Sequence, residues 1–168
     1  MKKIFVLLLL GICLFAVSAC GTEQPGDEPP EDTYCFVFQD TEIRVGAKLP
    51  SVLEGLRSQE AKVSVKPSCL NGVSGEDVTY VYNGFQIKTF RTEVNDPNEE
   101  IRWIILIDDL LMTPEGITIW SSVEAVKAAY GDATKDTGEW LYYQKGSCLL
   151  GFSYRDGLVT KIEYSPVD

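Results

Sequence analysis

Carboxylates and thiols are the side chains that could support chemistry in this sequence, because it contains no histidine. That absence excludes Ser-His-Asp and Cys-His nucleophilic arrangements and removes the commonest metal ligand. The oxygen-rich stretch Asn95–Glu100 matches no EF-hand spacing and has no glycine for the turn, so it predicts a solvated loop in preference to a calcium site. Asp108 and Asp109 lie between two apolar runs, and neighbouring strand residues point to opposite faces, so this pair predicts a turn.

One of the five cysteines is placed for covalent modification. Lys2 and Lys3 precede an uncharged apolar run over residues 4–17, and Ser18-Ala19-Cys20 follows it, which is the three-part form of a secretory signal. The motif is similar to a bacterial lipobox, whose cysteine thiol is acylated before the signal is cut in front of it; the new N-terminus is then acylated, with palmitate for example. We therefore predict a signal peptide over residues 1–19 and a lipid anchor at Cys20, which would hold the chain at the outer, extracytoplasmic face of the cell membrane. An ordinary cleaved signal is the alternative.

The cysteines of the remaining chain are Cys35, Cys69 and Cys148, an odd number for an oxidising compartment. One disulfide and one buried thiol is the simplest arrangement. We favour Cys35–Cys69, because both lie at the edges of predicted elements in the first half, while Cys148 lies within an apolar strand, where cysteine packs as a small hydrophobe. No CxxC spacing and no glycine-rich phosphate loop is present, so we predict neither a metal nor a cofactor.

Residues 20–33 form an acidic, proline-rich stretch without apolar side chains that could join a core, and they predict an extended tether. Residues 34–168 are the predicted single domain, a common domain size. The formal charge of −10 becomes −12 once Lys2 and Lys3 leave with the signal. Nucleic acid is excluded as a partner, because binding it requires a cationic surface.

The domain contains a degenerate internal repeat, with halves at about 34–107 and 108–168. Ile43 to Leu56 has strand-like and then helix-like apolar spacing, and Ile117 to Tyr130 repeats it 74 residues later. Ser121 and Glu124 form a capping box for the second helix, and Gly131 is a suitable stop. A short hairpin precedes each predicted helix: 34–45 in the first half, and 110–116 in the second.

Three strands follow each predicted helix. They cover Val78–Tyr82, Phe85–Phe90 and Ile101–Ile107 in the first half, and Trp140–Gln144, Cys148–Tyr154 and Leu158–Tyr164 in the second. Two tandem hairpin-helix-three-strand repeats predict an α+β fold, with a largely antiparallel sheet and helices on one face.

The strand with Gly46, the helices that end at Leu56 and at Tyr130-Gly131, and the meanders after them resemble the repeat of β-lactamase-inhibitor-protein-like domains. They are also similar to small outer-membrane-assembly lipoproteins. Pro67-Ser68-Cys69 and the stretch 113–117 resemble short sequence motifs of uncharacterised small bacterial lipoproteins. Trp120 departs from the pattern, because a glycine is expected there. The resemblance implies a binding or scaffold role and brings no catalytic residues.

Aromatic side chains are the feature of the sequence that indicates a ligand-binding surface. Tyr80 and Tyr82 share one strand face, as do Trp140 and Tyr142. With Trp120 they form the predicted ligand-binding face, because tyrosine and tryptophan dominate interface hot spots. The alternative is cross-strand packing that stabilises the sheet, and we assign Trp103 to packing because its strand is apolar on both faces.

The leading hypothesis is a non-enzymatic, lipid-anchored binding or scaffold protein for a protein, peptide or envelope polymer. The first alternative is an inhibitor of a secreted hydrolase, whose basic active-site rim would meet the acidic surface. The second is a small envelope hydrolase that uses two carboxylates, as glycosidases do.

Overall fold

The computed structural model describes residues 32–167. The predicted signal peptide, Cys20 and the tether up to residue 31 lie outside the described residues. Thr33, assigned to the tether, is buried, and its carbonyl oxygen accepts a hydrogen bond of 2.8 Å from the Arg44 guanidinium. The packed part of the chain therefore includes Thr33. Within the described range, the helices are too short or too polar to cross a membrane.

Strands dominate the fold, so the prediction of an α+β fold is wrong: 51% of the described residues are in strands and 11% in helices. The helices have only seven and eight residues. The elements in chain order are β1 (Cys35–Phe38), β2 (Thr41–Arg44), α1 (Leu49–Gly55), β3 (Lys62–Leu70), β4 (Val73–Val81), β5 (Phe85–Arg91), β6 (Glu100–Leu106), α2 (Val123–Tyr130), β7 (Lys135–Asp136), β8 (Trp140–Lys145), β9 (Cys148–Arg155) and β10 (Leu158–Pro166).

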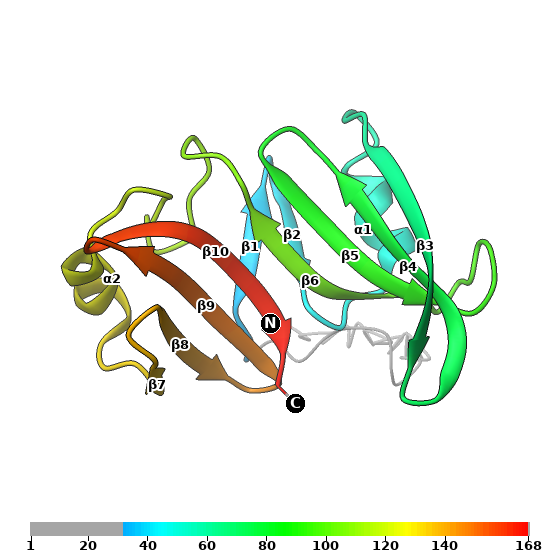
Figure 1. The fold of residues 1–168 in the computed structure, drawn as a ribbon. Helices are drawn as coiled ribbons and strands as arrows, with labels where there is room; N and C mark the ends of the chain where they lie inside the picture. The colour runs from blue at the N-terminus through cyan, green and yellow to red at the C-terminus, as the bar shows by residue number, and fades with distance from the viewer. Residues whose placement is uncertain (1–31, 168) are drawn as a thin grey trace, which may run out of the picture.

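The strands form a separate β1–β2 hairpin and one eight-strand antiparallel sheet in the order β3-β4-β5-β6-β10-β9-β8-β7 (Figure 1). Each half of the large sheet is a meander of sequential neighbours. The two meanders meet at a seam between β6 and β10, where Leu106 pairs with Ile162 and Ile104 with Tyr164.

Each meander has four strands where the sequence predicted three. The additional strand of the first half is β3, whose nine residues pair with β4 in continuous register from Lys62–Val81 to Leu70–Val73. The additional strand of the second half is the two-residue β7. The hairpin predicted over 110–116 is reduced to a single bridge between Met112 and Thr118. The two additional strands, β3 and β7, raise the strand content above the prediction.

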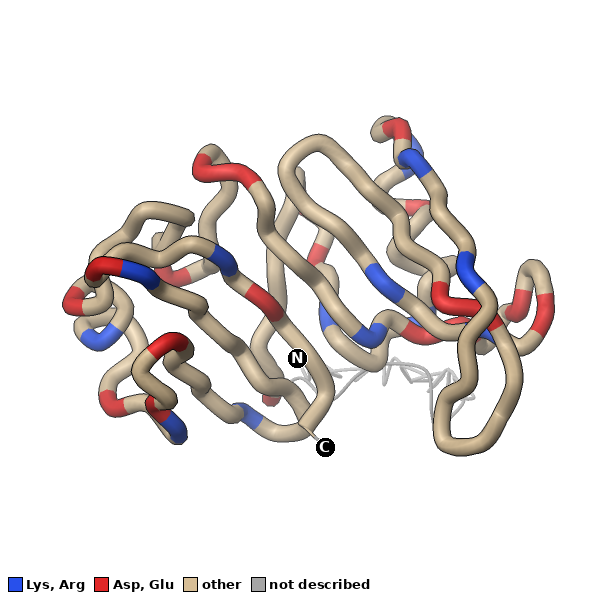
Figure 2. Tube along the Cα trace, viewed as in Figure 1, with Lys and Arg blue, Asp and Glu red and all other residues tan. Residues whose placement is uncertain are grey.

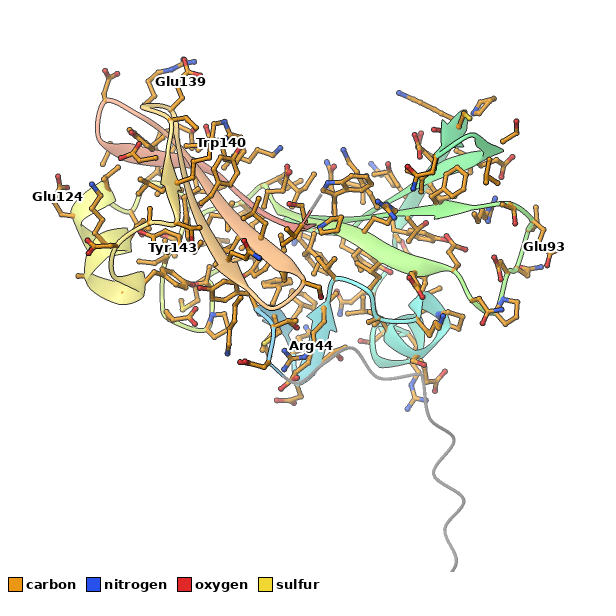
Figure 3. The ribbon with its side chains drawn as sticks, turned by 90° about the horizontal axis from the view of Figure 1, so that it is seen from below. Arg44, Glu93, Glu124, Glu139, Trp140 and Tyr143 are labelled. Carbon is orange, nitrogen blue, oxygen red and sulfur yellow. The ribbon has the colours of Figure 1, made fainter. Side chains whose placement is uncertain are left out.

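The core lies on one face of the large sheet, which we call the inner face. The β1–β2 hairpin and α1 cover this face, as Figures 1 and 3 show from two directions. Phe36 and Ile43 from the hairpin and Val52 from α1 are buried with sheet residues such as Ile104 and Phe152 in one hydrophobic cluster. Burying such side chains contributes about 1.5–3 kcal/mol each.

The second helix packs on the inner face of the second meander. The ring of Tyr130, at the end of α2, lies 5.2 Å from the rings of both Tyr143 and Phe152. Its N-cap is Ser122, one residue after the predicted Ser121, and the Ser122 hydroxyl accepts a hydrogen bond of 3.1 Å from the Ala125 amide. A serine cap of this kind stabilises a helix by about 1 kcal/mol.

Candidate functional site

The opposite face of the large sheet, which we call the open face, contains two adjoining hollows. The first has a volume of about 560 Å³, and its lining residues are Ser64, Lys66, Asp77, Thr79, Gln86, Lys88, Thr89, Trp103, Ile105 and Glu163. The second has about 480 Å³ and is lined from Lys135 through Tyr142, Gln144 and Leu149 to Val167. Both hollows include Trp103 and Glu163, so these two residues lie on the boundary between them.

Trp103 reaches the open face by the ordinary alternation of β6, next to a local irregularity in the sheet. Trp103 pairs with Lys88, whereas the next pair along the strands is Thr89 with Ile101, so Arg102 is left without a partner in the ladder. Such a bulge re-aims side chains. The Arg102 guanidinium lies over the Trp103 ring, 5.2 Å from its centroid. Trp103, which the sequence assigned to packing, is therefore at the centre of the site.

Trp140 and Tyr142 form a rigid aromatic pair on the same face. Their rings are stacked, with centroids 5.5 Å apart and an interplanar angle of 5°. Gly151 on β9 makes room for them, because a Cβ there would lie 3.0 Å from a Tyr142 ring carbon and 3.1 Å from a Trp140 ring carbon. Figure 3 shows Trp140 and Tyr143 on opposite sides of β8. Burial and then the charge of Glu163 raise the pKa of Tyr142, which keeps its hydroxyl protonated at neutral pH.

Positive charge is concentrated on the open face of this acidic chain. In Figure 2, several acidic positions lie in the loops around the sheet, while basic positions recur along its strands. Lys66, Lys88 and Lys135 line the hollows, against Asp77 and Glu163. Glu163 is paired with Lys161, whose ammonium also lies 5.5 Å from the centroid of the Trp140 ring.

The structure separates the five aromatic residues of the predicted ligand-binding face. Only Trp140 and Tyr142 lie on the open face. Tyr82 is on the inner face, where it is 5% exposed and its ring stacks on Phe85 with centroids 4.8 Å apart. Tyr80 shares the strand face of Tyr82 and packs against the core. Trp120 lies in the loop before α2 and is 60% exposed.

The three cysteines of the described residues are free thiols, so the predicted Cys35–Cys69 disulfide is not formed. Cys35 is half-buried in the β1–β2 hairpin, whereas Cys69 is exposed near the turn between β3 and β4. Cys148 is buried, as the sequence predicted for a small hydrophobe, and burial raises its pKa to about 11. It is therefore protonated and unreactive at neutral pH.

The two carboxylates of the first hollow come from strands that are not neighbours in the sheet. Asp77 is on β4 and Glu163 on β10, with β5 and β6 between them. Three inter-strand spacings of about 4.8 Å separate their backbones by roughly 14 Å. Both residues therefore contribute charge and hydrogen-bond acceptors to the hollow.

The Asn95–Glu100 loop is organised by hydrogen bonds within the protein. The Asn98 amide donates to the Asp96 carboxylate at 2.8 Å, and the Thr89 hydroxyl donates to the buried carboxylate of Glu99. Residues 32–167 contain no group of three or more cysteine, aspartate or glutamate side chains placed to hold a metal ion.

Lys88 and Trp103 are residues of the site that sequence reasoning did not select. The signal for Lys88 was present, because the strand pattern of Phe85–Arg91 alternates apolar and polar residues and places Gln86 and Lys88 on the face opposite Phe85 and Ile87. Comparison with protein-family models, with curated proteins and with solved structures found no significant match, so the family resemblance of the sequence stays a prediction.

Proposed function

We propose that this protein is a non-enzymatic binding protein that holds a macromolecular ligand on the open face of its sheet. The observation that supports this best is the pair of adjoining hollows that share Trp103 and Glu163. Together they extend from β3 to β8, a surface far wider than a small molecule needs. Tryptophan and tyrosine in preorganised positions are typical anchors of protein interfaces.

The proposal keeps the predicted lipid anchor. An acylated Cys20, followed by the acidic tether, would carry the sheet at the outer face of the membrane. Cys20→Ser should leave the uncut precursor and abolish acyl labelling of the protein, whereas globomycin treatment of the producing cells should leave a precursor that is uncut but still labelled. Acyl labelling that persists in the Cys20→Ser variant would disprove this part.

Site-specific photocrosslinking tests the binding face. A photoreactive residue at Thr79, in the first hollow, should give a discrete adduct in the producing cells. The same residue at Glu54, on α1 and exposed on the other side of the molecule, is the matched control and should give none. Trp103→Ala should remove the Thr79 adduct. Equal adducts at both positions, or no adduct at Thr79, would contradict the proposal.

Inhibition of a secreted hydrolase is the second candidate, because the stacked Trp140–Tyr142 pair offers a rigid aromatic surface to a folded protein. The purified chain would then inhibit a member of a panel of extracellular peptidases and β-lactamases, and Trp140→Ala would weaken that inhibition. Crosslinking at Thr79 to a protein without hydrolytic activity would favour the first candidate.

A further inference from the structure

The open face is rich in positive charge, whereas the whole chain is acidic. Acidic residues outnumber basic ones by 25 to 15 in the sequence. In contrast, the two hollows contain three lysines and two carboxylates, and Arg102 and Lys161 lie over the Trp103 and Trp140 rings beside them. A cationic surface on an acidic protein attracts anionic groups and directs their approach.

Three cations on this face lack ion-pair partners among the described residues. Lys66, Lys88 and Arg102 form no ion pair within residues 32–167, although Lys66 lies directly opposite Asp77 in the β3–β4 ladder. The Arg102 Nε is buried without a hydrogen-bond acceptor. Its guanidinium is held in place by the Trp103 ring. A carboxylate from a ligand would supply the missing counter-charge.

The aromatic rings favour a polypeptide over a glycan. Sugar rings bind tryptophan by packing their C–H groups flat on an unoccupied ring face. Here the Arg102 guanidinium lies over the Trp103 ring, and the Lys161 ammonium and the stacked Tyr142 ring lie against Trp140, so each tryptophan ring already has a charged neighbour that a sugar would have to displace or avoid. From β3 to β8 the face spans six inter-strand spacings, about 29 Å, which is the length of about nine extended residues.

We propose that the ligand of the open face is an acidic polypeptide segment, whose carboxylates are bound by Lys66, Lys88 and the Arg102 guanidinium on Trp103. This inference rests on the proposed binding function of the same face. It names the chemistry of the ligand, and it can fail while that function stands.

A charge-reversal series on the mature chain tests the inference. The probe is a fluorescent oligoglutamate peptide, with oligoglutamine and polygalacturonate as competitors of different chemistry. Lys88→Glu should weaken oligoglutamate binding about tenfold, as expected for loss of a close charge pair. Arg57→Glu makes the same change in net charge in the turn after α1, away from the open face, and should change the affinity less than twofold. Raising the salt concentration should weaken binding by the wild type.

Each other outcome overturns the inference. Equal losses of oligoglutamate affinity in Lys88→Glu and Arg57→Glu would show that only the net charge of the protein matters, and not the position of the lysine. Stronger competition by polygalacturonate than by free oligoglutamate would make the ligand an anionic glycan, and no oligoglutamate binding at low salt would exclude acidic polypeptides. Thermal unfolding of both variants checks their folding, and Lys88→Gln replaces Lys88→Glu if the latter unfolds. If the Thr79 adduct persists unchanged in Lys88→Glu, the binding function survives and only its acidic ligand fails.

Discussion

Trp120 and Gly46 occupy equivalent positions 74 residues apart, and both have a left-handed backbone, with φ of 73° and 85°. Glycine adopts this conformation freely, whereas a residue with a Cβ is strained by about 1–2 kcal/mol. The tryptophan turn is fixed by hydrogen bonds, since the Trp120 amide donates to the Val159 carbonyl at 2.8 Å and the Thr118 amide to the Ser121 hydroxyl at 3.0 Å.

Trp120→Gly should therefore be at least as stable as the wild type, by up to about 1 kcal/mol. Relief of the strain is offset in part by the greater entropy of glycine in the unfolded chain. Trp120→Ala keeps a Cβ and should be less stable than Trp120→Gly. Urea unfolding of both variants measures the difference. An alanine variant that is more stable than the glycine variant would show that the turn is not strained.

Tyr82→Ala and Trp140→Ala should have opposite consequences. Tyr82 is buried against Phe85, so its truncation should lower the free energy of unfolding by about 3 kcal/mol. Trp140 lies on the open face, and its truncation should cost less than about 1 kcal/mol. Urea unfolding measures both. If the two variants lose the same stability, Trp140 belongs to the packing of the sheet.

Gly151→Ala should disturb the aromatic pair without straining the backbone, because the new Cβ would lie 3.0–3.1 Å from the rings of Tyr142 and Trp140. The rings must move, so the near-ultraviolet circular dichroism of the folded protein should change and crosslinking through Thr79 should fall. Ser153→Ala, on the same strand, is the control. An unchanged spectrum in Gly151→Ala would mean that the rings adapt freely.

Thiol alkylation at pH 8 should modify Cys69 first and Cys148 last. Cys69 is exposed, while burial raises the pKa of Cys35 and raises that of Cys148 from 9.0 to about 11. Because the folded-state pKa of Cys148 exceeds the unfolded value, this thiol stabilises the fold below pH 9, and that contribution is lost as the pH rises towards 11. Peptide mapping after timed alkylation gives the order. Early modification of Cys148 in folded protein would contradict its burial.

Much of the strand pattern could be predicted from the sequence, because alternation and turn residues are local signals. The six predicted strands coincide largely with β4, β5, β6, β8, β9 and β10. β3 was missed although Val63 and Val65 alternate with lysine and serine, because Pro67 weakened the signal and an edge strand is exposed on both faces. That strand contributes most to the difference between an α+β fold and a mostly β one.

The composition of the site was harder to predict, because periodicity shows which residues share a face and not which face is covered. Tyr80 with Tyr82 and Trp140 with Tyr142 have identical spacing, yet the first pair lies on the inner face and the second on the open face. The position of the helices and of the β1–β2 hairpin decides between them. Trp103 alternates with the buried Ile104, but β6 is apolar on both faces, so its pattern did not show that Trp103 lies on the open face.

The seam between β6 and β10 determines the order in which the chain can fold. Every other neighbouring pair in the large sheet is a hairpin of sequential strands, whose ends meet after a short loop closes. Pairing Leu106 with Ile162 requires closure of a much longer loop, which is entropically expensive and slow. We therefore expect the first meander to form while the second is still being synthesised, and the two halves to join last. The surface around Trp103 and Glu163, which lie on the two strands of the seam, would then form only in the last step of folding.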